Sequence, residues 1–202
     1  MKTHFLICLC AASLLFCAVA DAEIVGTKKK GLKGRYLDLE PAVNFRDYHN
    51  ALIVLDPAEI TSDKDRPVDT ESIRKISYEV LTEKLKLLSL FGDVVEIAPL
   101  KISDDMKILR IQATLTLQYG SEAMRFWVGM GAGKSKTHIR LDIFDALTGQ
   151  KLGYYNGYGT GAGSWSMSGG GAQWLAQDDL EENYQRFVEL IAQKSGIAVS
   201  GG

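Results

Sequence analysis

The segment Gly129-Met130-Gly131-Ala132-Gly133-Lys134-Ser135 comes closest to a reactive motif, because its Gly-Lys-Ser end matches the end of a phosphate-binding loop. Such a loop also requires a glycine five positions before the glycine of that end, and the chain has Val128 there. The residues that follow alternate between polar and apolar, as in a strand, whereas a phosphate loop leads into a helix. The spacing therefore predicts a turn built from glycines and no nucleotide site.

The other titratable and nucleophilic residues form no catalytic or metal-binding pattern. Neither His49 nor His138 has a carboxylate or a second histidine at the spacing of helical metal ligands. No serine lies in a nucleophile-elbow pattern, and the adjacent pairs Asp104-Asp105 and Asp178-Asp179 fit turn and helix-start chemistry. The sequence thus predicts no catalytic residue, no cofactor site and no metal site, and we expect a protein that is not an enzyme.

Aromatic residues beside glycines are the candidates for contact with a partner. Eight of the nineteen residues from Gly153 to Gly171 are glycine, which disfavours a helix and predicts a mobile segment. Exposed aromatic rings mark protein interfaces and can also stack on sugars, whereas Trp127 falls in an expected strand and is expected in the core. The candidate partner contacts are Trp165, Trp174, Tyr155 and Tyr158.

Two alternating segments must position these features. From Leu109 to Leu117, apolar residues take the odd positions and polar residues the even ones, which predicts a strand with one solvated face. Residues 137–144 repeat this alternation. The following Asp145-Ala146-Leu147-Thr148-Gly149 predicts a hairpin loop, with Gly149 suited to positive φ, that leads to a strand at 151–158.

The remaining elements complete an expected α+β fold. The apolar run Ala51-Leu52-Ile53-Val54-Leu55 predicts a central strand buried on both faces. Apolar residues at spacings of three and four predict a helix from Asp69 or Thr70 to Gly92. A second helix is expected at about 178–193, with its acidic residues at the positive N-terminal end. Shorter strands are expected at 35–39, 94–97 and 124–128. We expect a mainly antiparallel sheet of about five to six strands with two helices packed on one face.

Residues 1–22 are typical of a secretory signal peptide. A charged start precedes an apolar run from Phe5 to Val19, and cleavage is expected after Ala22. An uncleaved membrane anchor is one alternative, although the run is shorter than the ~20 residues of a spanning helix. Lipid attachment at Cys17 is another, although a lipoprotein signal places a small residue before that cysteine and the chain has Phe16.

Composition limits the partners and the covalent chemistry. The 202 residues carry a formal net charge of −2, so neither nucleic acid nor a bulk acidic surface is implied as a partner. All three cysteines lie in the leader, and the exported chain is therefore expected without disulfides. In the basic lead-in, Lys28, Lys29 and Lys30 could touch an anionic membrane surface. The expected divisions are a signal peptide at 1–22, a flexible lead-in at 23–34, one α+β domain at 35–195 with a Gly-rich segment at 153–171, and a disordered tail at 196–202.

A family resemblance is carried by Arg125, Gly129, Gly131, Gly133 and Lys134, which form an arginine-aromatic-x-x-glycine-x-glycine-x-glycine-lysine turn. An alternating strand follows this turn and ends in an aspartate-alanine-x-threonine-glycine hairpin. In order and spacing, these motifs resemble bacterial cell-envelope proteins of the domain-of-unknown-function 4410 family.

The resemblance implies an exported, non-enzymatic protein of the cell envelope. We expect it in the periplasm, with a membrane-anchored or extracellular location as alternatives, and we expect envelope proteins as its partners. Our leading hypothesis is a protein-binding or envelope-assembly accessory module. The alternative is a periplasmic ligand- or glycan-binding protein that uses the aromatic and Gly-rich segment.

Overall fold

A computed structural model describes residues 23–28, 34–62, 68–98, 106–118, 136–159 and 172–197. At 23–28 and 172–176 it describes the backbone only. The expected strand at 124–128, the glycine turn with its five family-motif residues, and Trp165 all lie outside the described residues.

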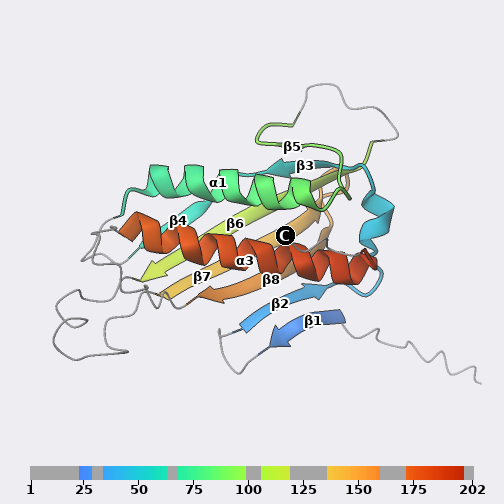
Figure 1. Ribbon diagram of the computed structural model, residues 1–202. Coiled ribbons are helices and arrows are strands. Elements are labelled where there is room, and N and C mark those ends of the chain that lie inside the picture. Colours follow the sequence, from blue (N-terminus) through green and yellow to red (C-terminus); the bar gives the residue numbers. More distant parts are fainter. Residues whose placement is uncertain are drawn as a thin grey trace, which may run out of the picture.

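In the part of the chain that the structure describes, eight strands form a single sheet (Figure 1). In chain order they are β1 (Glu23–Lys28), β2 (Gly34–Leu39), β3 (Leu52–Leu55), β4 (Glu59–Ser62), β5 (Val94–Val95), β6 (Ile108–Gln118), β7 (Lys136–Asp145) and β8 (Lys151–Gly159). Seven of them follow one another across the sheet in the order β1-β2-β8-β7-β6-β3-β5. Strand β4 pairs with β6 farther along the edge that β3 occupies.

The sheet is larger than the sequence predicts, and it is mixed. The four pairs from β1 to β6 are antiparallel, but β3 and β4 run parallel to β6, and β5 runs parallel to β3. A helix between β4 and β5 allows this, because parallel neighbours need a long crossover connection. The run that forms β3 is fully buried as expected, but it lies next to the edge strand β5 and not at the centre of the sheet.

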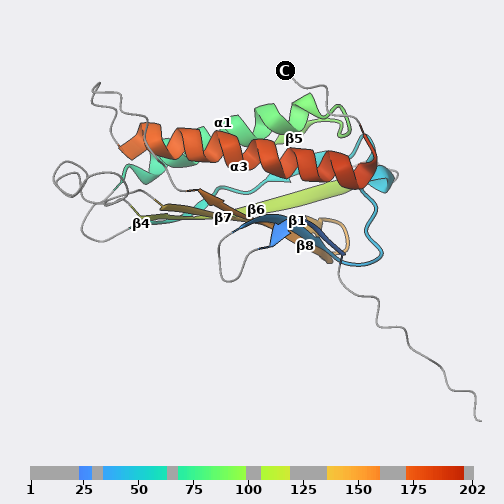
Figure 2. The same ribbon diagram turned by 60° about the horizontal axis from the view of Figure 1, so that its bottom comes forward.

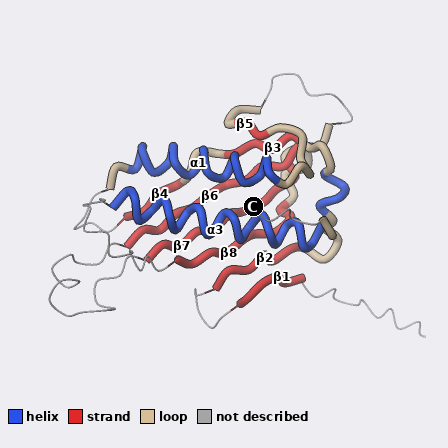
Figure 3. Tube along the Cα trace, viewed as in Figure 1, coloured by secondary structure: helices blue, strands red, loops and turns tan. Residues whose placement is uncertain are grey.

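Helices α1 (Thr70–Leu87) and α3 (Ala172–Ser195) lie side by side on one face of the sheet (Figures 2 and 3). A short 3-10 helix, η1 (Phe45–Tyr48), connects β2 to β3. The expected start of α1 is confirmed, since the Asp69 side chain accepts a hydrogen bond from the Ser72 amide at 3.1 Å. The helix ends before Gly92, because Ser89 already adopts a left-handed conformation with φ 49.

Helix α3 begins at Ala172, which is earlier than the sequence predicts. Its first turn contains no acidic residue, so the expected contact of Asp178 and Asp179 with the positive helix end is wrong. Trp174 lies in this helix. The sequence does not predict this early start, because the first turns of α3 directly follow a glycine-rich segment that disfavours a helix.

Both ends of the described chain are more ordered than expected. Residues 23–28 form β1 in place of a flexible lead-in, and their β-branched Ile24, Val25 and Thr27 favour a strand. At the other end, Gly196 has φ 63, and Ile197 donates its amide proton to an α3 carbonyl at 2.9 Å. This arrangement is a Schellman cap, so the first two residues of the expected disordered tail are ordered.

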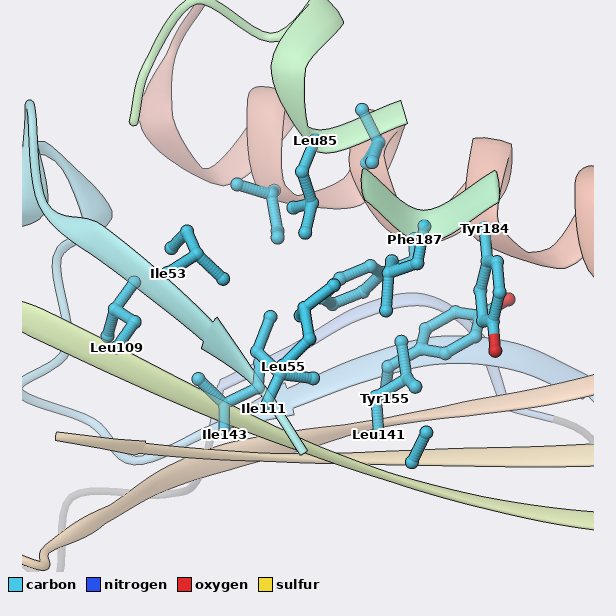
Figure 4. Packing of buried hydrophobic residues seen from close by; sticks show 14 of the residues in the cluster. Ile53, Leu55, Leu85, Leu109, Ile111, Leu141, Ile143, Tyr155, Tyr184 and Phe187 are labelled. Atoms are coloured by element: carbon cyan, nitrogen blue, oxygen red, sulfur yellow. The ribbon is translucent and has the colours of Figure 1, made fainter. Parts of the chain in front are cut away.

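The main core lies between the helices and the sheet (Figure 4). Tyr155 of β8 packs against Phe187 of α3, with ring centroids 5.3 Å apart. Tyr184 lies beside them, and its hydroxyl is 2.6 Å from the Ser77 hydroxyl of α1. Tyr155 is 0% exposed because the odd positions of β8 face the helices. It cannot serve as the partner contact that the sequence predicts.

Glycines let α3 approach β8 closely. A Cβ atom at Gly159 would lie 2.7 Å from the Asp179 Oδ1 atom, and one at Gly157 would collide with the Asn183 side chain. The Asp179 carboxylate therefore rests almost on the backbone of β8, where it accepts a hydrogen bond from the Thr137 hydroxyl at 2.5 Å. Part of the glycine content of 153–171 thus serves strand packing, since β8 extends to Gly159.

Candidate functional site on the open sheet face

The candidate site is the sheet face opposite α1 and α3, which no described helix covers (Figure 2). We call it the open face. Cross-strand pairing places its residues in rows across β6, β7, β8 and β2. The rows are Gln112-Asp142-Tyr154-Asp38, then Thr114-Arg140-Asn156-Tyr36, then Thr116-His138-Tyr158, with Arg110, Phe144 and Lys151 alongside.

Asp142 lies at the centre of an ion-pair cluster on this face. Arg140 donates from Nε to both carboxylate oxygens of Asp142 at 3.1 Å, and Lys151 Nζ lies 2.7 Å from Oδ1. The two cations also lie over the Tyr154 ring, with Arg140 Cζ 4.2 Å and Lys151 Nζ 5.6 Å from its centroid. Tyr154 donates from its hydroxyl to Asp38 at 2.9 Å. One carboxylate is thus shared by two cations, and Asp38 supplies a second carboxylate beside the Tyr154 ring.

A β-bulge brings Lys151 into this cluster. Ile143 pairs with Gly153, but the next residue, Phe144, pairs with Lys151, so Leu152 is an extra residue in β8. The bulge places Leu152 in the core, where it is 4% exposed, and turns the preceding residue, Lys151, toward the open face. Without this irregularity, strict alternation along β8 would direct Lys151 to the helix side of the sheet.

The carboxylates on the open face lie deeper than their cationic partners. The Asp142 side chain is 20% exposed, against 39% for Arg140 and 42% for Lys151. The same holds at the neighbouring pair, where Asp56 is 21% exposed and Arg110 is 49% exposed. At these two sites the outermost charged groups are therefore cations, and the acidic groups beneath them orient the cations.

Electrostatics stabilise this arrangement. Burial disfavours the charged form of Asp142, but the hydrogen bonds from Arg140 and Lys151 outweigh it and hold the carboxyl pKa below its ordinary value. The hydrogen bond to Asp142 in turn raises the pKa of Arg140. Burial, followed by hydrogen bonding with Tyr36 and Asp38, raises the pKa of Tyr154. All of these groups therefore keep their ordinary charge states at neutral pH.

His138 lies in the row beside this cluster. Its Nε2 atom is 2.7 Å from Asn156 Oδ1, and Asn156 donates from Nδ2 to the Gly34 carbonyl at 3.4 Å. His49 is exposed on the short connection after η1. Among the described residues, no group of three His, Cys, Asp or Glu side chains could hold a metal ion.

The predicted contact residues are not gathered into one site. Tyr158 is half-buried on the open face, Tyr155 is in the core, and Trp174 is in α3. Lys28 ends β1, while Lys29 and Lys30 lie outside the described residues. The Arg140 cluster was not predicted as a site. Its signal in the sequence is the alternation of His138, Arg140 and Asp142 with apolar residues, which marks a solvated face without saying what it binds.

A cavity of about 230 Å³ has lining residues from α1, from β6 and from the connection between β3 and β4, among them Ser77, Ala113 and Ala58. Among the described helices, neither α1 nor α3 combines the length and hydropathy needed to cross a membrane.

The comparisons with known proteins bear on family membership. The model of one family, described as a domain of unknown function (DUF4410), matches residues 49–164 of the 202. The chain belongs to this family. The resemblance inferred from the glycine turn and the hairpin is thereby confirmed. None of the curated proteins compared with the chain matches it significantly.

Solved structures with a similar chain path include two bacterial proteins. The PelC dodecamer from Paraburkholderia phytofirmans is 14% identical, with a TM-score of 0.45, over 81% of this chain and 97% of that chain. Protein XCC0632 from Xanthomonas campestris is 8% identical, with a TM-score of 0.43, over 78% of this chain and 91% of that chain. No functional inference rests on either likeness.

Proposed function

We propose that this protein is an exported, non-enzymatic binding module of the cell envelope that docks a partner protein on its open face. One observation carries the proposal. The sheet has a face without a described covering helix, and that face carries aromatic rings and charged side chains that are already hydrogen-bonded to one another.

Pre-formed ion pairs make such a face suitable for burial. Removing a lone charge from water is costly, whereas a carboxylate already paired with Arg140 and Lys151 loses less when a partner covers it. Aromatic and arginine side chains are enriched in protein interfaces for this reason and for their contact area. Tyr154, Tyr158 and Arg140 supply both kinds of side chain on one surface.

A protein partner fits this face better than a sugar. Sugar recognition commonly uses the flat face of an aromatic ring. On the open face, Arg140 and Lys151 lie over the Tyr154 ring, so a sugar would have to displace both cations to stack there. The non-enzymatic part of the proposal has a similar basis, because Arg110, Arg140 and Lys151 are already paired with the carboxylates of Asp56 and Asp142.

Export and an envelope location form the remaining part of the proposal. They are supported by the leader-like residues 1–22 and by the motifs shared with envelope proteins. The basic residues around Lys28 would then lie near the anionic surface of a membrane, as a secondary contact.

Capture of a partner from envelope extract of the native host tests the proposal. Thr114→Trp adds bulk in the middle of the open face, beside Arg140, without entering the core. Lys75→Trp adds the same bulk to the outer surface of α1, where the Lys75 side chain is 75% exposed. We expect the wild type and Lys75→Trp to retain the same partner, and Thr114→Trp to lose it. Equal capture by all three proteins would contradict docking on the open face.

A further inference from the structure

We propose that the open face recognises an acidic segment of its partner protein, whose carboxylates bind Arg140 and Lys151 above the Tyr154 ring. This inference rests on the proposed function and adds the chemistry of the partner.

Charge is layered on the open face. In the pairs Arg110–Asp56, Arg140–Asp142 and Lys151–Asp142, the cation is about twice as exposed as the carboxylate that it contacts. Arg110, Arg140 and Lys151 therefore meet an approaching partner before Asp56 or Asp142 does. A surface with this layering attracts negative groups and is complementary to carboxylates.

The ion pairs orient the cations. Arg140 uses Nε and Nη2 on Asp142, and no residue in the described part of the chain accepts a hydrogen bond from Nη1. Lys151 shares the same carboxylate, so two cations are held side by side on Asp142. Side chains held in this way lose little rotamer freedom when a ligand binds, and a charge-assisted hydrogen bond is stronger than a neutral one.

A second cationic position lies farther along the sheet. Arg110 donates from Nε to Asp56, and no described residue accepts a hydrogen bond from its terminal nitrogens. The register places Arg140 opposite Thr114, four residues along β6 from Arg110, which corresponds to about 13 Å. An extended peptide with acidic side chains can reach both positions. A single small anion cannot.

Binding to poly-L-glutamate measures this chemistry directly. The exported chain, residues 23–202, would be titrated by calorimetry at low ionic strength with poly-L-glutamate, with polygalacturonate and with phosphatidylglycerol vesicles. We expect poly-L-glutamate to bind, and Arg140→Gln and Lys151→Gln each to weaken it about tenfold. The matched control is Lys75→Gln, which removes one positive charge from the exposed surface of α1 and should change affinity less than twofold.

Asp142→Asn separates oriented recognition from general attraction. This variant makes the protein more positive, so simple attraction predicts tighter binding of poly-L-glutamate. Oriented recognition predicts weaker binding, because Arg140 and Lys151 lose the carboxylate that holds them. Tighter binding by Asp142→Asn, or equal losses in Arg140→Gln and Lys75→Gln, would overturn the inference. If polygalacturonate or the vesicles bind more tightly than poly-L-glutamate, and Arg140→Gln weakens that binding by the same factor, the partner is not an acidic protein segment.

Failure of this inference can be distinguished from failure of the proposed function. If Thr114→Trp loses the captured partner but Arg140→Gln retains it with unchanged affinity, the open face docks a protein and the acidic chemistry is wrong. If Thr114→Trp also retains the partner, docking on the open face is itself wrong.

Discussion

The contact between Gly159 and Asp179 gives the sharpest test of how α3 is held on the sheet. A Cβ atom at position 159 would lie 2.7 Å from Oδ1, 2.8 Å from Cγ and 3.1 Å from Oδ2 of Asp179. All three nearest atoms belong to that one carboxylate, and the φ angle of Gly159 is not in the left-handed region. Alanine is therefore excluded by the packing of α3 and not by the backbone of β8.

The magnitude follows from this geometry. Ordinary carbon contacts lie near 3.5–4.0 Å, so Gly159→Ala forces the carboxylate or the helix to move, at about 1–3 kcal/mol. In an Asp179→Ala background the obstructing atoms are gone. The same glycine substitution should then be neutral or stabilise by about 0.4–1 kcal/mol, because alanine restricts the unfolded chain. The expected coupling energy between the two positions is about 1–3 kcal/mol.

Urea unfolding of the four proteins in this cycle, followed by circular dichroism, measures the coupling. Gly149→Ala is the matched control. Gly149 has no atom within 4 Å of its Cβ position but has φ 72, as its place in the hairpin predicts. The Gly149→Ala substitution should lower the free energy of unfolding by about 1 kcal/mol both in the wild type and in the Asp179→Ala background. A Gly159→Ala cost that is the same with and without the Asp179 side chain would refute the packing argument.

Three further predictions follow from the described contacts and the leader. Burial raises the pKa of Asp179 despite the hydrogen bond from Thr137. The folded protein therefore favours the protonated side chain, and Asp179 makes its full contribution to stability below its ordinary pKa of 3.8. That contribution is lost as the pH rises through the raised pKa of the folded protein. Asp179→Asn should therefore be more stable than the wild type at neutral pH, and this advantage should vanish in acid, as thermal melts across pH will show. Tyr184→Phe leaves the buried Ser77 hydroxyl without its partner and should cost about 1–3 kcal/mol in urea unfolding, whereas adding Ser77→Ala should restore part of that loss. Intact-mass measurement of the protein from its native host should show loss of residues 1–22, and a mass that keeps them or includes an acyl chain on Cys17 would exclude this cleavage.

Local patterns determined most of the individual elements. The alternation in 109–117 and 137–144 gave β6 and β7, because a strand with one buried face needs apolar residues at every second position. The Asp69 cap and the apolar stripe gave α1, and the hairpin residues gave the turn with Gly149 at positive φ. These features depend on residues that are neighbours in the chain, so they can be predicted without the fold.

Only the tertiary structure decided which strands are parallel and what the glycines do. The parallel pairing of β3 with β6 joins segments that are distant in sequence, and the pattern of a buried strand is the same at the centre of a sheet and beside its edge. In the sequence, Gly159 belongs to a segment predicted to be mobile. In the fold, its missing side chain leaves the space that the Asp179 carboxylate of α3 occupies. Lys151 enters the Arg140 cluster through a bulge that strict alternation does not foresee. The sequence alone thus determined the solvated strand face and the family, whereas the ion-pair cluster depends on contacts across strands that only folding brings together.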